Sequence, residues 1–561
     1  MNQEARRLVD RLWNYCNVLR DDGVSASSYL EQLSLLVFLK MADETEKLNA
    51  HRPVGDHEHM LPTAPEWKGR GWPELIDLEG DPLEEAYSKL LADLGRRSAE
   101  DDHTTLSLIF NRARNHIENP THLRRLIADL INKEKWRDSR SDINGAAYEA
   151  LIARSASDTK AGAGQYFTPR PLIESIVRCM RPTPYDTITD PACGTGGFLI
   201  SAYEYIIREY GDDLPDDDLH RLRTKAIWGH EIVPATARLA AMNCLLHSLG
   251  DPTGEPIIEV GDALARPPQR HASLVLANPP FGRRSGINVS GKEADAEADD
   301  RDNVTYNRPD FWVGEQTTTN KQLNFLQHIG TQLTDRGRAA VIVPDGVLYE
   351  GGPGSVGDLV RRELLTGYNL HTMLRLPENI FYAGGVKAHV LFFEAVPGHR
   401  VDDDPPHTTD LWTYDLRTDS RFTLKKNPMK PEHLADFEKQ AFAPSDLDRR
   451  HRKESDRFRR HRAADLLAGK QVNLDIARLS PEASAAKEPP ASIDSLTRSV
   501  AGDLRSALAE IEAFAKDLGV DLATVSERVE ACSPSPSVGA TGMQDGAATT
   551  SSPRGRDGID T

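Results

Sequence analysis

Short apolar runs alternate with helical patterns between residues 186 and 281, and this alternation constrains the fold more than any other feature. Helical patterns at 198–210 and 234–249 separate the first three runs. The apolar runs themselves cover residues 186–190, 226–231, 257–260 and 273–277. Because strands that alternate with helices pair in parallel, the sequence predicts an α/β fold, with a Rossmann-like sheet covered by helices on both faces. Ligands of such sheets bind at the carboxyl ends of the strands.

A glycine-rich turn follows the first predicted strand and suits a nucleotide-like cofactor. It contains Asp190, Gly194, Thr195, Gly196 and Gly197. Glycines let a ligand approach the backbone closely, and the first N–H groups of the following helix attract anions. The turn lacks the G-x-G-x-x-G spacing of dinucleotide-binding folds. Since a carboxylate at the strand end can also hold an ammonium group, the turn favours S-adenosylmethionine (AdoMet) as the cofactor.

Acidic residues also follow the second and third predicted strands. Glu231 ends the second strand and is placed to accept hydrogen bonds from both ribose hydroxyls of the cofactor. Dinucleotide-binding proteins use an acid in the same way, so Glu231 alone does not discriminate between cofactors. Asp262, after the third strand, can accept a hydrogen bond from the exocyclic amine of the cofactor's adenine, and Ala263 beside it belongs to the same predicted site.

Another candidate for cofactor binding precedes the helical pattern at 172–180. Its residues are Gln165, Tyr166, Phe167, Thr168, Pro169 and Arg170. A hydroxyl group and backbone N–H groups at a helix start form an anion site, which suits the carboxylate of AdoMet. The alternative interpretation is a simple helix start that uses proline at its first position.

The sequence Asn278-Pro279-Pro280-Phe281 follows the fourth predicted strand and carries the candidate chemistry. The exocyclic amine of adenine is a poor nucleophile because its lone pair is delocalised into the ring. The Asn278 side-chain oxygen and the Pro279 carbonyl can accept its hydrogens and aim the lone pair at a methyl sulfonium. Pro280 stiffens the turn, and Phe281 can stack on a base that has left the duplex. Positioning and fixed dipoles then supply most of the rate acceleration.

The remaining sequence suggests further segments. Residues 1–140 are expected to form a helical domain that docks DNA or a partner, and residues 141–480 the methyltransferase domain. A helix for partner docking is expected within 481–530, and a disordered tail at 531–561. The polar stretch at 282–316 is too long for an ordinary loop. It either closes over DNA or an extruded base, or is a surface loop without a role.

Charge and composition narrow the choice of partners. The net charge is −18, which argues against a chain that grips DNA unaided, since Lys and Arg supply most non-specific affinity. The basic tract at 449–462 either is solvated or faces a phosphate backbone. No apolar run reaches the ~20 residues of a membrane span, no metal site is expected, and five scattered cysteines suit a reducing cytoplasm.

The motifs resemble those of amino-directed DNA methyltransferases, and more specifically the methylation subunit of type I restriction–modification systems. The resemblance covers most of residues 1–480, and Thr195 departs from it, since many relatives carry Ser there. It rests on residues 165–170, 190–197, 229–231, 262–264, 278–281, 343–348, 379–386 and 422–428.

This resemblance implies N6-adenine methylation of double-stranded DNA, with AdoMet contacts at 165–170, 195–197 and Glu231. It also implies a helical N-terminal domain that helps to hold DNA, a separate specificity subunit that reads the sequence, and two methylation subunits per assembly. A translocating restriction subunit is a further possible partner.

Three other functions stay open from the sequence. The first is a stand-alone or phage-defence adenine methyltransferase that recognises its own target. The second is methylation of a protein or of RNA. The third is a non-catalytic scaffold in a phage-defence complex, against which the intact 278–281 motif argues.

Overall fold

The computed structural model describes most of one unit of the chain, residues 1–476. The described residues are 3–49, 60–61, 70–100, 104–136, 143–158, 168–281, 305–381, 386–398, 406–417, 422, 427–442 and 449–476. The expected helix in 481–530 and the expected tail at 531–561 lie outside them, as does the stretch 282–304.

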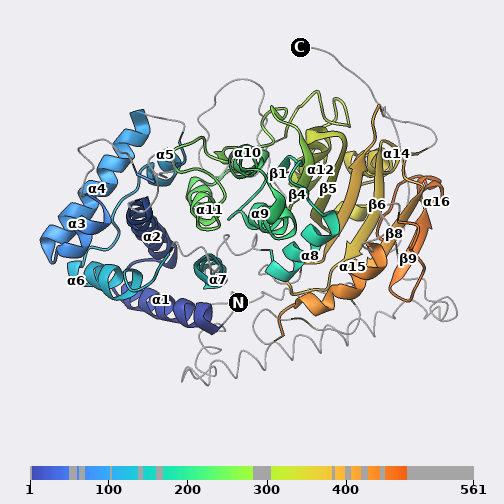
Figure 1. The fold of residues 1–561 in the computed structure, drawn as a ribbon. Helices are drawn as coiled ribbons and strands as arrows, with labels where there is room; N and C mark the ends of the chain where they lie inside the picture. Colours follow the sequence, from blue (N-terminus) through green and yellow to red (C-terminus); the bar gives the residue numbers. More distant parts are fainter. Residues whose placement is uncertain are drawn as a thin grey trace, which may run out of the picture. The chain divides into compact units, whose positions relative to one another are not determined.

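A nine-stranded sheet organises the described residues from 168 to 476, in the order β3-β2-β1-β4-β5-β7-β6-β8-β9. Figure 1 labels β1, β4, β5, β6, β8 and β9 among these strands. The strands are β1 Ile188–Asp190, β2 Ile227–Glu231, β3 Ile258–Val260, β4 Ala272–Ala277, β5 Leu333–Pro344, β6 Tyr368–Arg375, β7 Ala388–Ala395, β8 Asp410–Asp415 and β9 Phe458–Arg462. The first five strands in this order pair in parallel, and β7 is antiparallel to both of its neighbours. The predicted α/β fold with a mostly parallel Rossmann-like sheet is confirmed.

Helices bury both faces of the sheet. The helices of this part are α8 Arg170–Met180, α9 Gly197–Tyr210, α10 Asp216–Arg221, α11 Pro234–Leu246, α12 Lys321–Gln332, α13 Gly346–Tyr349, α14 Val356–Thr366, α15 Ala435–Ala441 and α16 Ala463–Leu467. In β4, Leu274 and Leu276 join the core formed with α8, α9 and α11, whereas Val275 and Ala277 join the core formed with α12 and α14. A strand buried on both faces reads as a continuous apolar run, which is why β4 lacks polar alternation.

The predicted helical N-terminal domain is also observed, and its helices pack against the sheet-containing part through α11 and the residues before β3. They are α1 Gln3–Asp21, α2 Ala26–Asn49, α3 Trp72–Asp77, α4 Asp81–Glu100, α5 Thr105–Phe110, α6 Pro120–Arg124, continued by a π-helical turn Arg125–Ile131, and α7 Ile143–Asp158. The Thr105 N–H donates to the Gly254 carbonyl at 2.9 Å. The Arg238 guanidinium forms an ion pair with Glu31 at 3.1 Å.

The far end of the sheet differs from one expectation drawn from the sequence. The alternating pattern at 411–424 suggests an edge hairpin, but β8 instead lies between β6, parallel to it, and β9, antiparallel to it. The edge strand β9 comes from the basic tract at 449–462, whose Arg449 pairs with Glu394 and whose Arg452 is buried. Part of the basic tract therefore has a structural role in the sheet and its packing.

Asp186, just before β1, joins the amino end of β4 to the middle of β5. Its carboxylate accepts hydrogen bonds from the Ser273 hydroxyl at 2.6 Å, the Thr183 N–H at 2.7 Å and the Arg338 guanidinium at 2.9 and 3.0 Å. Burial alone would raise the pKa of Asp186, but the hydrogen bonds and charge of Arg338 outweigh it and lower the pKa to about 2. The folded state thus favours the ionised carboxyl group.

We expect Asp186→Asn to lower the free energy of unfolding by about 2 kcal/mol at pH 7, because each pKa unit corresponds to about 1.4 kcal/mol. The stabilisation is present above the ordinary aspartate pKa of 3.8 and is lost as the pH falls from there through about 2. Urea unfolding from pH 7 downward should show a constant deficit that shrinks only below about pH 4. The exposed Asp335→Asn is the control, and an equal loss in both variants would contradict the account.

Candidate active site

The sheet brings the polar residues of four strand ends to one edge. Asp190 is the last residue of β1 and Glu231 the last of β2, while Asp262 and Asn278 follow the ends of β3 and β4. These strands are parallel neighbours in the order β3-β2-β1-β4, so their carboxyl ends share one edge of the sheet. The structure thus collects the acids and the Asn-Pro-Pro-Phe turn that the sequence places far apart.

The glycine-rich turn is held tightly against its surroundings. Gly196 caps α9 in a left-handed conformation with φ of 84°, and a Cβ atom there would lie 3.2 Å from Cys244 Sγ. A Cβ atom on Gly197 would lie 3.0 Å from a terminal carbon of Ile173. The Thr195 carbonyl accepts a hydrogen bond from the Asn243 amide at 2.9 Å. A side chain at Gly196 or Gly197 would therefore crowd α8 or α11, and glycine lets the turn pack this closely.

Asp190 is buried beneath this turn and is 2% exposed. Its carboxylate accepts a hydrogen bond from the Ala192 N–H at 2.9 Å. Burial raises the pKa of Asp190 to about 8, the Ala192 N–H counteracts this, and the neighbouring Glu231 carboxylate adds to the rise. At neutral pH the protonated form of Asp190 is therefore favoured, and a cationic ligand beside it would favour the ionised form.

Glu231 connects the turn with the end of β2. Its carboxylate accepts hydrogen bonds from the Gly194 N–H at 3.1 Å and from the Val233 N–H at 2.8 Å. Burial raises the pKa of Glu231, although these two N–H groups oppose the shift. Two acidic side chains therefore lie close together at this edge of the sheet, and in their ionised forms they would attract a positively charged ligand.

Exposed apolar side chains border Glu231. Ile232, Val233 and Val260 are 62%, 48% and 46% exposed, and Val260 pairs in register with Glu231. Such side chains suit the flat face of a purine. The sequence analysis missed them, although two β-branched residues directly after a strand-ending acid were a usable signal.

Asp262 is engaged by the described end of the long polar stretch. One carboxylate oxygen accepts from the Leu264 N–H at 2.9 Å, and the other accepts from the Tyr306 hydroxyl at 2.7 Å. Tyr306 and Phe311 form a small apolar cluster with Leu264, against which Ala263 packs. Residues 305–316 thus pack beside the predicted cofactor site, and the expectation that the stretch closes over DNA concerns residues outside the described range.

The Asn278 side chain is buried, and among the described residues only its nitrogen has a hydrogen-bond partner. Its Nδ2 atom donates to the Thr168 hydroxyl at 2.7 Å, whereas its Oδ1 atom is buried without a hydrogen-bond partner among the described residues. The next turn is supported from α12, where the Gln322 amide donates to the Pro280 carbonyl. Phe281 packs edge-to-face on Phe381, with ring centroids 5.4 Å apart. An unsatisfied acceptor and an aromatic pair therefore lie at one end of β4.

Among the six residues predicted before α8, Thr168 reaches the Asn278 side chain. Pro169 starts α8, and Gln165, Tyr166 and Phe167 lie outside the described residues. The Arg170 guanidinium forms ion pairs with Glu149 at 2.6 Å, with Glu174 at 3.1 Å and with Glu204. Its charge is thus matched within the protein, and a contact of Arg170 with the cofactor stays a prediction.

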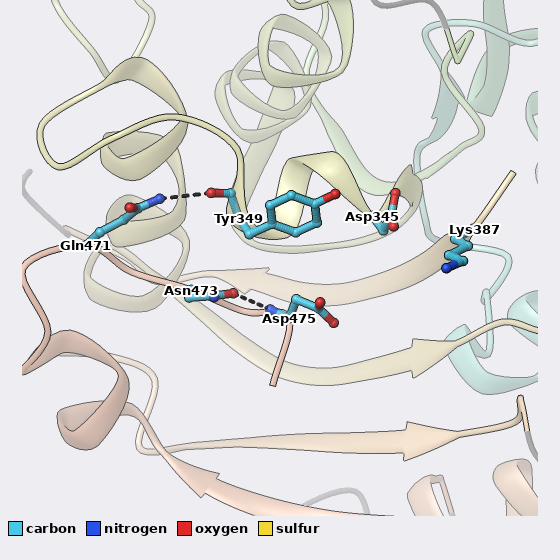
Figure 2. A pocket seen from close by; sticks show the side chains of 6 residues that line it. All are labelled: Asp345, Tyr349, Lys387, Gln471, Asn473 and Asp475. Carbon is cyan, nitrogen blue, oxygen red and sulfur yellow. Dashed lines mark hydrogen bonds between the residues drawn. The ribbon is translucent and has the colours of Figure 1, made fainter. Parts of the chain in front are cut away.

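A separate hollow of about 730 Å³ opens where β5 ends (Figure 2). Its lining residues are Asp345, Tyr349, Lys387, Gln471, Asn473 and Asp475. The Gln471 amide donates to the Tyr349 carbonyl at 2.8 Å, and the Asn473 side chain accepts from the Asp475 N–H at 2.8 Å. None of the predicted catalytic or cofactor-binding residues lines it, although Asp345 belongs to the stretch 343–348 on which the resemblance rests.

No helix in the described ranges is both long and apolar enough to cross a membrane. Likewise, no group of three or more His, Cys, Asp or Glu side chains in the described part of the chain is placed to hold a metal ion.

Comparison with known proteins identifies two families along the chain. The N-6 DNA Methylase family matches residues 139–488, and the HsdM N-terminal domain family matches residues 8–143. The chain is 35% identical over 550 residues to the type I restriction enzyme EcoKI methylase subunit of Escherichia coli, covering 91% of this chain and 95% of the relative. The StySJI methylase subunit of Salmonella typhimurium is also 35% identical, over 551 residues, with the same coverage.

A solved structure shares the fold. The crystal structure of the type I restriction–modification methyltransferase subunit from Streptococcus thermophilus matches with a TM-score of 0.61 and 18% identity. The match covers 84% of this chain and 99% of that one.

Proposed function

The chain belongs to the N-6 DNA methylase family as a methylase subunit of a type I restriction–modification system, and from this we propose that its crevice binds AdoMet and a flipped-out adenine side by side. Because the chain belongs to this family, its activity is N6-adenine methylation of DNA. The proposal concerns the cofactor, the residues and the partners. The observation that carries it is the buried, unsatisfied Oδ1 atom of Asn278 at the edge that also bears Asp190 and Glu231.

The residues of the crevice fit AdoMet. The glycine-rich turn leaves room for close approach, Asp190 suits the ammonium group, and Glu231 suits the ribose hydroxyls. Ile232 and Val260 offer apolar faces to the adenine ring, and Asp262 can accept from its amine while Tyr306 holds the carboxylate in place.

AdoMet supplies an electrophilic methyl group on a sulfonium. The side-chain oxygen of Asn278 and the carbonyl of Pro279 would accept the two hydrogens of the target amine, which turns its lone pair toward that methyl group. A nitrogen–carbon bond forms as the sulfur–carbon bond breaks, and the surplus proton of the amine leaves toward solvent. No strong base is needed, because positioned acceptors favour the developing charge on nitrogen.

The extruded adenine requires a face to stack on, and Phe281 offers one. Phe381 packs against Phe281 edge-to-face and would fix its orientation. Base–aromatic stacking is worth about 1–3 kcal/mol per base, which offsets part of the cost of unstacking the target from the duplex.

We further propose that double-stranded DNA is held jointly with partners. A net charge of −18 leaves little non-specific affinity for phosphate, so a specificity subunit is expected to read the sequence. A second copy of this chain and a restriction subunit complete the proposed assembly, with the cytoplasm as its location. Both relatives are named as subunits, which supports an assembly of several chains.

Sequencing of methylated bases tests this function. Host DNA should carry N6-methyladenine at one fixed sequence when this gene and that of its specificity subunit are both present, and should lose it when either is deleted. Unchanged methylation after deletion of this gene would contradict the proposal.

A further inference from the structure

We infer that Thr168 is a positioning residue for Asn278, which fixes the orientation of its amide so that Oδ1 faces the substrate. The inference rests on the proposed function, and it gives Thr168 a role different from the cofactor contact predicted for it from the sequence.

The hydrogen bond between the two side chains is well shielded from water. Asn278 Nδ2 lies 2.7 Å from the Thr168 hydroxyl oxygen, and each residue is 7% exposed. Buried polar atoms in folded proteins nearly always have a partner. Here the nitrogen of the amide has one, whereas the oxygen has none among the described residues. The arrangement therefore pairs the Asn278 nitrogen with Thr168 and leaves the Asn278 oxygen to accept a hydrogen bond from the substrate.

The orientation of this amide decides whether it can assist methyl transfer. A half-turn about its last bond exchanges oxygen and nitrogen with almost no change of shape. In the reversed orientation the NH2 group would face the adenine amine, and two donors would oppose each other. In the observed orientation the Thr168 oxygen accepts from Nδ2. A hydroxyl can also donate, so Thr168 favours this orientation when its own hydrogen is bound to another acceptor. Its own hydrogen then remains available for the anion site predicted at this segment.

Thr168 is itself firmly held. It precedes Pro169, whose carbonyl accepts the N–H groups of Leu172 at 2.9 Å and Ile173 at 3.1 Å in the first turn of α8. The next residue, Arg170, is held by carboxylates from α7, α8 and α9. A side chain on such a rigid helix start can impose its geometry on a neighbour.

The catalytic turn is therefore held from both faces of the sheet. Thr168, before α8, holds the Asn278 side chain on one face, and Gln322, on α12, donates to the Pro280 carbonyl from the other. These two contacts leave little freedom for rotation of the segment between Asn278 and Pro280. Asn278 and Thr168 are 110 residues apart in the sequence, so the folded sheet alone brings them together.

The test uses Thr168→Val, which keeps the shape of the side chain but removes the acceptor. In the assembled complex on duplex DNA with its mapped target, we expect kcat to fall about 10- to 100-fold, because small misplacement of a reacting group costs about this much. The AdoMet Kd, measured by calorimetry, should change much less than kcat, because only the Thr168 hydroxyl is lost from the predicted cofactor contacts and the others stay in place. Thr168→Ser restores the acceptor and should recover most of kcat.

Thr408→Val is the matched control. It removes a buried threonine hydroxyl that donates to the Tyr368 carbonyl at 2.9 Å near the amino ends of β6 and β8, and it should leave kcat unchanged. The inference is overturned if Thr168→Val keeps the wild-type kcat, or if its defect lies wholly in the AdoMet Kd. Asn278→Ala in the same assay separates the two claims. If that variant still transfers methyl groups, the proposed function fails; if it is inactive while Thr168→Val is normal, only the role of Thr168 fails.

Discussion

Replacing Asn278 with alanine is expected to lower the rate of methyl transfer by about a hundred- to a thousandfold, the cost of losing one fixed polar group that acts in the transition state. The side-chain oxygen is buried, lacks a partner among the described residues and follows β4 directly. Its loss removes an acceptor for the target amine without touching the glycine-rich turn. The rate constant should fall while AdoMet binding persists.

Single-turnover methylation of a duplex with the mapped target, together with the AdoMet Kd from calorimetry, measures both quantities. Asn369→Ala is a matched control, because this half-buried asparagine lies at the amino end of β6 and donates to Glu394 at 3.1 Å. The control should keep its rate. A wild-type rate in Asn278→Ala, in a correctly assembled complex, would show that catalysis lies elsewhere.

Glu231→Ala is expected to weaken AdoMet binding by about 10- to 1000-fold, because hydrogen bonds to a charged group contribute about 1.5–3 kcal/mol each. The variant also frees the N–H groups of Gly194 and Val233, which the carboxylate now holds at 3.1 and 2.8 Å. The turn then loses its side-chain attachment to β2 and keeps the hydrogen bond from the Cys193 N–H to the His230 carbonyl at 2.9 Å. Glu231→Gln retains one acceptor oxygen and should show a smaller loss.

Calorimetric titration of the assembled complex with AdoMet gives these affinities. Glu259→Ala is the control, since Glu259 pairs with His230 at 3.1 Å and its side chain points to the opposite face of the sheet from Glu231. The proposed ribose contact would be contradicted if Glu231→Ala bound AdoMet with wild-type affinity and its circular dichroism showed an unchanged fold.

The strand ends were the most predictable part of the molecule. Parallel strands are buried on both faces, so β1, β2 and β4 read as short apolar runs, and the residue after each run marks the ligand edge. Asp190, Glu231 and Asn278 could therefore be placed at one edge before the structure was known. Their roles in binding and catalysis stay predictions, because adjacency does not establish a contact with a ligand.

Contacts between distant segments could not be predicted. The pairing of Thr168 with Asn278 depends on where α8 crosses the sheet, which no local pattern specifies. The same reason explains the error at β8, because its true partners β6 and β9 are set by packing rather than by a turn. Tyr306 likewise reaches Asp262 from a stretch whose composition indicates only a loop.

The most direct test of the account is a structure of the assembled complex with sinefungin, an unreactive AdoMet analogue, and a duplex that carries the target site. We expect the analogue between the glycine-rich turn and Glu231, and the extruded adenine with N6 about 3 Å from both Asn278 Oδ1 and the Pro279 carbonyl oxygen. If the analogue and the adenine occupied separate surfaces, or the adenine stayed stacked in the duplex, the shared crevice would be refuted.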